Sequence, residues 1–131
     1  MTDLATGLWQ RALDAIRVAK HDLVVSADAA ASRAYYAAFY AVSARFALEG
    51  KTFARHSAVE AAVHRDLVKA GLWPKDLGER YSMLVELRSI SDYGDVEHVS
   101  PQEAKDAIAA ATAILDSVRE SSSGRFPPFQ G

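Results

Sequence analysis

The stretch Ser32-Arg33-Ala34-Tyr35-Tyr36-Ala37-Ala38-Phe39-Tyr40 lies in the middle of a long alanine-rich segment. Ten alanines occur between Ala27 and Ala47, and Gly50 follows at a position suited to ending a helix. The segment therefore predicts a helix over about residues 27–48. Its many small side chains let neighbouring helices approach closely, which favours a place inside a helical bundle.

The sequence on either side of this segment predicts further helices. Apolar residues at helical spacing indicate a first helix of about 20 residues, with Thr2 as its N-cap and an end near Val25-Ser26. A third helix follows the loop 51–55 and ends at Gly71. The residue types His56-Ser57 are suited to capping the start of that third helix.

A fourth helix starts at about Lys75 and breaks around residues 92–94. The fifth has the clearest start, because Ser100-Pro101-Gln102-Glu103 combines an N-cap serine, a proline at the first helical position and a glutamate at the third. That helix should reach about Glu120. With no β-strand pattern and no internal repeat, the predicted fold is all-α, an antiparallel up-and-down bundle of about five helices in one domain over residues 1–120.

Length and composition limit the class of protein. The 131 residues include no cysteine, which excludes disulfides and a thiolate zinc site and fits a reducing compartment. The N-terminus lacks the pattern of a signal peptide, and the longest apolar run, residues 34–42, is about half of the roughly 18 residues of a membrane span. We therefore expect a cytoplasmic protein. Residues 121–131 are predicted to be a flexible tail, or one that docks through Phe126 and Phe129.

A second informative segment, Arg88-Ser89-Ile90-Ser91-Asp92-Tyr93-Gly94-Asp95, begins forty-eight residues after Tyr40. Together with the Tyr-Tyr-x-x-Phe helix, the His56-Ser57 start and the run from Gly71 to Leu77, it resembles the small stand-alone bacterial and archaeal members of the HEPN domain family. The four features occur in the family's order over roughly residues 5–120. The resemblance implies the same helical bundle that the residue pattern predicts.

For activity, the resemblance implies a site around Arg88. HEPN ribonucleases carry an arginine and, four to six residues later, a histidine, and two such motifs line one groove of a dimer. The arginine steadies the phosphate and the histidine assists attack by the RNA 2′-hydroxyl, with no metal or other cofactor required. Here the histidine window holds Tyr93, Gly94 and Asp95 instead. Arg88, Asp92 and Tyr93 are the candidate catalytic residues.

The chemistry of Tyr93 differs from that of a histidine. A free phenol is almost fully protonated at pH 7, whereas imidazole is mostly neutral, so a tyrosine here is better suited to donating a hydrogen bond to phosphate. On a continuous helix Arg88 and Tyr93 would point about 140° apart, so both face one groove only if the helix breaks between them. The alternative is structural: Arg88 and Asp92 form an i,i+4 pair worth about 0.2–0.5 kcal/mol.

Other side chains are weaker candidates for binding RNA or a nucleotide. Arg33 and Tyr36 share one stripe of the second helix with Tyr40, although most of these rings are expected in the core. Arg55 and His56 adjoin the third helix. His56, Glu60 and His64 recur every four residues, but eight residues of helix span about 12 Å, which is too far for one metal ion.

Two functions follow from the resemblance. The first is the toxin-like, RNA-acting component of a HEPN–nucleotidyltransferase toxin–antitoxin or defence pair, working as a homodimer and neutralised by a small nucleotidyltransferase antitoxin. The second is a non-catalytic HEPN dimer that binds a nucleotide or a partner protein, its nuclease activity lost with the histidine. The net charge of −2 means that binding to RNA requires a local basic patch.

Overall fold

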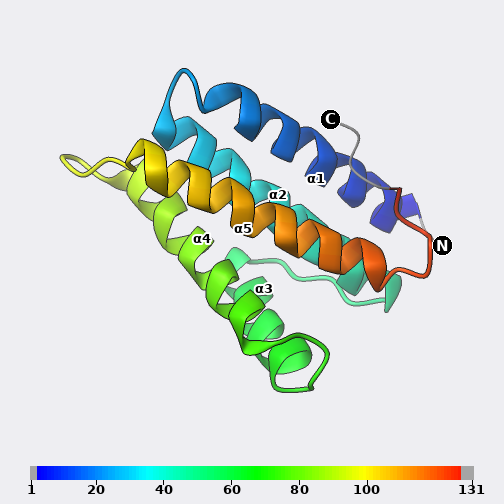
Figure 1. Cartoon of the computed structure of the whole chain (residues 1–131). Coiled ribbons are helices and arrows are strands. Elements are labelled where there is room, and N and C mark those ends of the chain that lie inside the picture. Colours follow the sequence, from blue (N-terminus) through cyan, green and yellow to red (C-terminus); the bar gives the residue numbers. More distant parts are fainter. Residues whose placement is uncertain (1–2, 128–131) are drawn as a thin grey trace.

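The computed structural model describes residues 3–127 and contains helices and no strands in that range. A hairpin of α1 and α2 packs against α5, while α4 crosses α2; α3 contacts α2, and η1 contacts α4 (Figure 1). The predicted all-α helical bundle is confirmed. The helices are α1 (Asp3–Asp22), α2 (Ala27–Leu48), α3 (His56–Ala62), the π-helix η1 (Val63–Val68), α4 (Lys75–Tyr93) and α5 (Pro101–Glu120).

Helix α2 forms the centre of the core, because it contacts α1, α4 and α5. Most of its alanines are fully buried, and larger side chains of the other helices fill the space beside them. None of the helices in residues 3–127 is long and apolar enough to cross a membrane. The largest fully buried side chains outside α2 are Trp9, Ile16, Leu67, Tyr81, Leu84 and Ile114.

Local sequence signals place the ends of α2 and α5. Helix α2 covers the predicted residues, and its N-cap Ser26 accepts a hydrogen bond from the Ala29 amide at 3.1 Å. At the start of α5 the predicted capping box is formed: Ser100 Oγ accepts from the Glu103 amide at 3.1 Å, and Glu103 Oε1 accepts from the Ser100 amide at 3.0 Å. The first helix ends at Asp22, earlier than predicted. The predicted cap Thr2 lies outside the described residues.

The third predicted helix is divided into two kinds of helix. After Ala62 the chain widens into η1, which ends at Val68, earlier than the predicted end at Gly71. The carbonyl of Leu67 then accepts hydrogen bonds from the amides of both Leu72 and Trp73 at 2.9 Å, closing the turn before α4. The wider winding is a tertiary effect with no signal in the sequence pattern.

The segment after α5 returns to α1. Phe126 is buried and its ring stacks on Trp9, with centroids 5.0 Å apart and planes 9° from parallel. Trp9 Nε1 also donates to the carbonyl of Pro127 at 2.9 Å. Phe126 therefore docks on α1, as the second of the two predictions for the tail expected. Phe129 lies outside the described residues. The flexibility of the tail stays a prediction.

Candidate functional site

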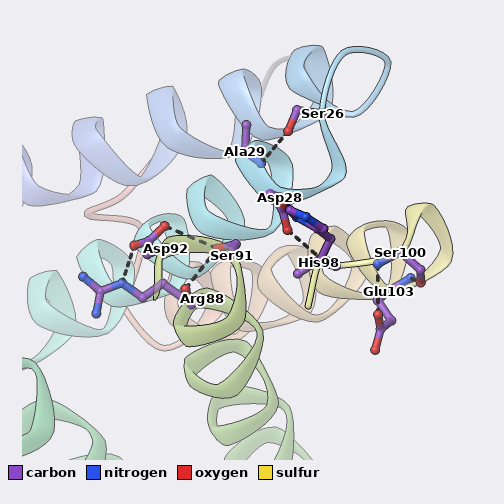
Figure 2. A network of polar contacts seen from close by, with 10 residues as sticks. Ser26, Asp28, Ala29, Arg88, Ser91, Asp92, His98, Ser100 and Glu103 are labelled. Atoms are coloured by element: carbon purple, nitrogen blue, oxygen red, sulfur yellow. Dashed lines mark hydrogen bonds and ion pairs between the residues drawn. The ribbon is translucent and has the colours of Figure 1, made fainter. Parts of the chain in front are cut away.

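Arg88 lies near the end of α4, with its side chain directed at α2. Its Nη2 donates to the Tyr36 hydroxyl at 2.9 Å. Its Nε donates to Asp92 Oδ2 at 2.9 Å (Figure 2). Ser91 Oγ donates to the Arg88 carbonyl at 3.0 Å. Only 21% of the Arg88 side chain is exposed. Two bonds to separate elements fix the plane of the guanidinium, so its orientation is set before any ligand binds.

Three aromatic rings surround the Arg88 guanidinium. Its Cζ atom lies 5.5 Å from the ring centroid of Tyr35, 5.4 Å from that of Tyr36 and 5.4 Å from that of Tyr93. Each contact is within the range of a cation–π interaction, worth about 0.5–1 kcal/mol at an exposed site. Tyr35 is buried and Tyr93 is 69% exposed. Tyr35 is thus part of the core, Tyr36 is half-buried against it, and Tyr93 faces solvent.

The predicted end of the fourth helix around residues 92–94 is confirmed, because α4 ends at Tyr93 with Gly94 as its C-cap. The condition that Arg88 and Tyr93 meet only if the helix breaks between them is wrong, because they are in contact on a continuous helix. Although Arg88 and Tyr93 leave the helix in different directions, the arginine side chain is long enough for its guanidinium to reach the Tyr93 ring. Arg88 and Asp92 do form the i,i+4 ion pair of the structural alternative. This pair is one part of a larger group of contacts around Arg88, here called the Arg88 cluster, which also includes Tyr35, Tyr36 and Tyr93.

His56 joins this cluster from the start of α3. Its ring stacks on Phe39, with centroids 4.2 Å apart and planes 6° from parallel, and its Nδ1 lies 2.7 Å from the Tyr35 hydroxyl. The prediction that His56 caps the helix is wrong, because the N-cap is Arg55, with no side-chain cap bond. Burial, with help from the Arg88 charge, lowers the pKa of His56 below 6.5.

The weaker candidates divide into two groups. Arg33 stacks over the Tyr36 ring at 5.0 Å, so it adjoins the Arg88 cluster. Arg55 is exposed, and its side chain makes no hydrogen bond or ion pair within the described part of the chain. The Tyr40 ring instead contacts Arg11 of α1, whose Cζ lies 5.8 Å from the ring centroid. Tyr35 and Phe39 were not selected as site residues from the sequence, although their rings contact His56. Their i,i+4 spacing on one helix was the available signal.

A buried polar layer lies behind the cluster. Burial raises the pKa of Tyr35 to about 12 and that of Tyr81 well above its ordinary value. The Tyr81 hydroxyl is buried without a well-aligned hydrogen bond among residues 3–127, and it lies close enough to the Tyr35 hydroxyl for each to shift the pKa of the other. Ser82 Oγ donates to Glu60 Oε2 at 2.9 Å and lies 2.8 Å from His64 Nε2. Within the described residues no group of three or more acidic or histidine side chains is arranged to hold a metal ion.

The sequence matches the HEPN domain family over residues 5–121, which includes every candidate site residue. The chain belongs to the HEPN family. It is also similar to a UPF0332 protein of Thermotoga maritima, with 40% identity over 91 residues that cover 70% of this chain and 69% of that protein. The arginine expected for the HEPN motif is Arg88, and the structure places it against α2.

The loop that follows α4 is tied to the first turn of α2. Asp28 accepts from the Val99 amide at 2.8 Å and pairs with His98 Nδ1 at 2.8 Å (Figure 2). Asp28 and Tyr36 are eight residues apart on one helix, about 12 Å. His98 therefore engages α2 two turns away from the residue that contacts Arg88, and it does not supply the missing histidine of the motif.

The Asp28 bonds predict an acid-sensitive loop. The Val99 amide, and to a lesser degree His98, hold the pKa of Asp28 below 3.8. A carboxyl whose pKa is lower in the folded state stabilises that state above its unfolded pKa, and this contribution disappears as the pH falls through the folded pKa. Urea unfolding midpoints measured from pH 6 to pH 2.5 should fall less steeply for Asp28→Asn than for wild type. Equal slopes would show that Asp28 contributes no such linkage.

Proposed function

We propose that this HEPN protein is the RNA-acting, toxin-like component of a pair with a small nucleotidyltransferase. The observation that carries the proposal is the Arg88 guanidinium, fixed by Tyr36 and Asp92 at the protein surface. Its Nη1 makes no hydrogen bond within residues 3–127. A planar guanidinium whose orientation is already set loses little entropy when it binds a phosphate group.

The surroundings of Arg88 suit a single RNA strand. Arg33 adds positive charge next to the cluster, and Arg55 precedes His56 in the chain; these two charges offset the overall charge of −2. The exposed ring of Tyr93 offers a stacking surface for a base. Beside Phe39 an apolar pocket of about 210 Å³ opens, lined by Leu4, Leu8, Phe39, Ser43, Lys51, Thr52 and Phe53. Phe39 also stacks on His56, so this pocket adjoins the cluster and offers a second place for a base.

The proposal includes a homodimer formed at the end of the bundle that carries Tyr93. Exposed apolar side chains occur there on the α1–α2 turn and around the α4–α5 connection, and Asp28 in the first turn of α2 bonds to that connection. Pairing of this surface with a second copy would bury these side chains and bring two Arg88 residues towards one groove. The side chains are Val24 and Val25 of the α1–α2 turn, with Tyr93 and Val96 at the α4–α5 connection.

Cleavage of RNA by purified protein tests the proposal. In EDTA, wild type should cut a random-sequence RNA pool and leave 2′,3′-cyclic phosphate ends, while Arg88→Ala should cut at least about 100-fold more slowly, the usual loss when one donor to a reacting oxyanion is removed. Arg17→Ala is the matched control, because Arg17 is an exposed arginine on α1. Sedimentation of the same samples should show dimers.

Growth of cells provides the second part of this test. Expression of wild type alone should stop growth, and co-expression of a neighbouring nucleotidyltransferase gene should restore it. A wild-type protein that leaves the whole RNA pool intact, or an Arg88→Ala protein that cuts equally well, would overturn the nuclease proposal.

A non-catalytic binding module is the second candidate, and the Asp92 contact favours it. A carboxylate already bound to Nε of Arg88 offsets part of the charge that a reacting phosphate needs. In that case wild type would bind a nucleotide or 2′-O-methyl RNA without cutting RNA, and Arg88→Ala would weaken binding. The RNA pool assay and the binding assay together separate the two functions.

A further inference from the structure

His56 is held in one orientation by α2, although it is the first residue of α3. The Phe39 ring lies parallel to it, and the Tyr35 hydroxyl engages its Nδ1 at 2.7 Å. Its Nε2 makes no hydrogen bond within residues 3–127. An imidazole fixed through one nitrogen, with the other nitrogen open, is the arrangement that enzymes use for proton transfer.

His56 and Arg88 lie against the same two rings. The His56 ring centroid is 5.8 Å from that of Tyr35 and 5.8 Å from that of Tyr36. Arg88 Cζ lies 5.5 Å and 5.4 Å from the same two centroids. The charge of Arg88 is also close enough to act on the imidazole. A phosphate held by Arg88 would therefore lie beside this histidine.

The other histidines of the chain are engaged elsewhere. His21 is on the last turn of α1 with 82% of its side chain exposed. His64 bonds to Ser82, and His98 bonds to Asp28. Of the four histidines in the sequence, His56 is the one that adjoins Arg88.

We propose that His56 is the proton acceptor of this site, in place of the histidine that is absent from positions 93–95. The inference rests on the proposed function, RNA cleavage at Arg88. His56 Nε2 takes the proton of the RNA 2′-hydroxyl, the 2′-oxygen bonds to the adjacent phosphorus, and the bond from phosphorus to the 5′-oxygen breaks. The 5′-oxygen takes a proton from solvent and the imidazolium returns one. The products are a 2′,3′-cyclic phosphate and a 5′-hydroxyl.

Tyr35 is the positioning residue for His56 in this scheme. For Nε2 to accept a proton, Nδ1 must carry hydrogen and donate it to the Tyr35 oxygen. Burial raises the pKa of Tyr35 to about 12, so its hydroxyl stays protonated and neutral at pH 7. The neutral Tyr35 hydroxyl therefore accepts a hydrogen bond from His56 Nδ1, and it does not compete with a phosphate for Arg88 as a phenolate would.

The groups around His56 set the pH dependence. Tyr35 and Tyr36 face it from α2 and Arg88 acts on it from α4, while Arg55 and Glu60 are on its own element. Burial and the Arg88 charge together lower the pKa of His56, so the neutral imidazole predominates at pH 7. The acid limb of the profile of kcat/KM against pH should lie below 6.5, the ordinary value for histidine.

The test compares His56→Ala and His56→Asn with wild type on the RNA pool in EDTA. Both variants should lower kcat/KM about 100- to 10,000-fold and leave binding of uncleavable 2′-O-methyl RNA within about twofold. Asparagine keeps a polar group towards Tyr35, which guards against a simple folding defect. His21→Asn is the matched control and should cut like wild type.

Two readouts separate proton transfer from a structural role. Tyr35→Phe should lower kcat with little change in KM and move the acid limb of the profile. Tyr40→Phe, which changes a ring on the same helix that contacts Arg11 of α1, should do neither. By NMR the imidazole of His56 should titrate below 6.5 in wild type and closer to 6.5 in Arg88→Ala. The NMR titration needs no activity.

The outcomes distinguish this inference from the proposed function. If wild type and Arg88→Ala both leave RNA intact, both proposals fail. If wild type cuts, Arg88→Ala does not, and the His56 variants cut like wild type, the nuclease stands and the role of His56 is overturned. An acid limb that persists unchanged in His56→Asn would overturn it as well.

Discussion

Replacing Trp9 with alanine is expected to lower the free energy of unfolding by about 3–5 kcal/mol, the usual cost of removing a large buried aromatic side chain. Trp9 is 1% exposed, stacks on Phe126 and donates to the Pro127 carbonyl. Its removal therefore leaves a cavity under the segment that follows α5 and an acceptor without its donor. Urea unfolding followed by circular dichroism at one fixed protein concentration measures the loss.

The partner residue and a surface control sharpen this test. Phe126→Ala should also destabilise, and the double variant Trp9→Ala/Phe126→Ala should lose less than the sum of the two, since coupled aromatic pairs interact by about 0.5–1.5 kcal/mol. Val18→Ala, on an exposed position of the same helix, should stay within about 0.5 kcal/mol of wild type. Strict additivity of the two core substitutions would contradict the stacked contact.

Replacing Gly94 with alanine should both destabilise the protein and disturb the Arg88 cluster. A Cβ on Gly94 would lie 2.7 Å from the Ile90 carbonyl oxygen and 2.9 Å from that of Glu97. Both atoms belong to the backbone, so the end of α4 and the loop after it must move. We expect a loss of about 1–3 kcal/mol, as for other overpacked sites, and a displaced Tyr93.

Gly7 provides the matched control for Gly94. It lies on the exposed side of α1, and a Cβ there would meet nothing within 4 Å apart from the adjacent backbone of its own helix. Gly7→Ala should therefore raise stability by about 0.5–1 kcal/mol. Unfolding midpoints and RNA cleavage should be measured for both variants. A Gly94→Ala protein as stable and active as wild type would contradict the expected clash of the added Cβ with the Ile90 and Glu97 carbonyl oxygens.

Helix ends that are determined by local capping residues were predictable from the sequence. The start and end of α2 and the capping box of α5 depend on contacts within a few residues, and both agree with the structure. The π-helix η1 depends instead on packing against α4, where Gly78 has no room for a side chain beside Val68 and His64. No local pattern encodes that contact.

The site was predictable to a smaller extent. Spacing and family resemblance selected Arg88 and Asp92, which are neighbours on one helix. The contact of His56 with Tyr35 spans 21 residues and depends on how α3 meets α2, so a cap was the natural interpretation of its residue type. The contact of Arg88 with Tyr93 depends on the length of the arginine side chain, which an angle between helix positions does not capture.

The aromatic wall of the Arg88 cluster also has a consequence for protein engineering. Tyr35 has one side in the core and the other at the guanidinium, so a substitution there changes stability and ligand contacts together. Tyr93 and Val96 are largely exposed within one copy, so substitutions there leave the core of the protomer intact. A library built at positions 93–97, with Gly94 left intact, would vary contacts with ligand and with the proposed second copy at little cost to folding of the protomer. Tyr35 and Tyr36 of α2 should be left unchanged in such a library.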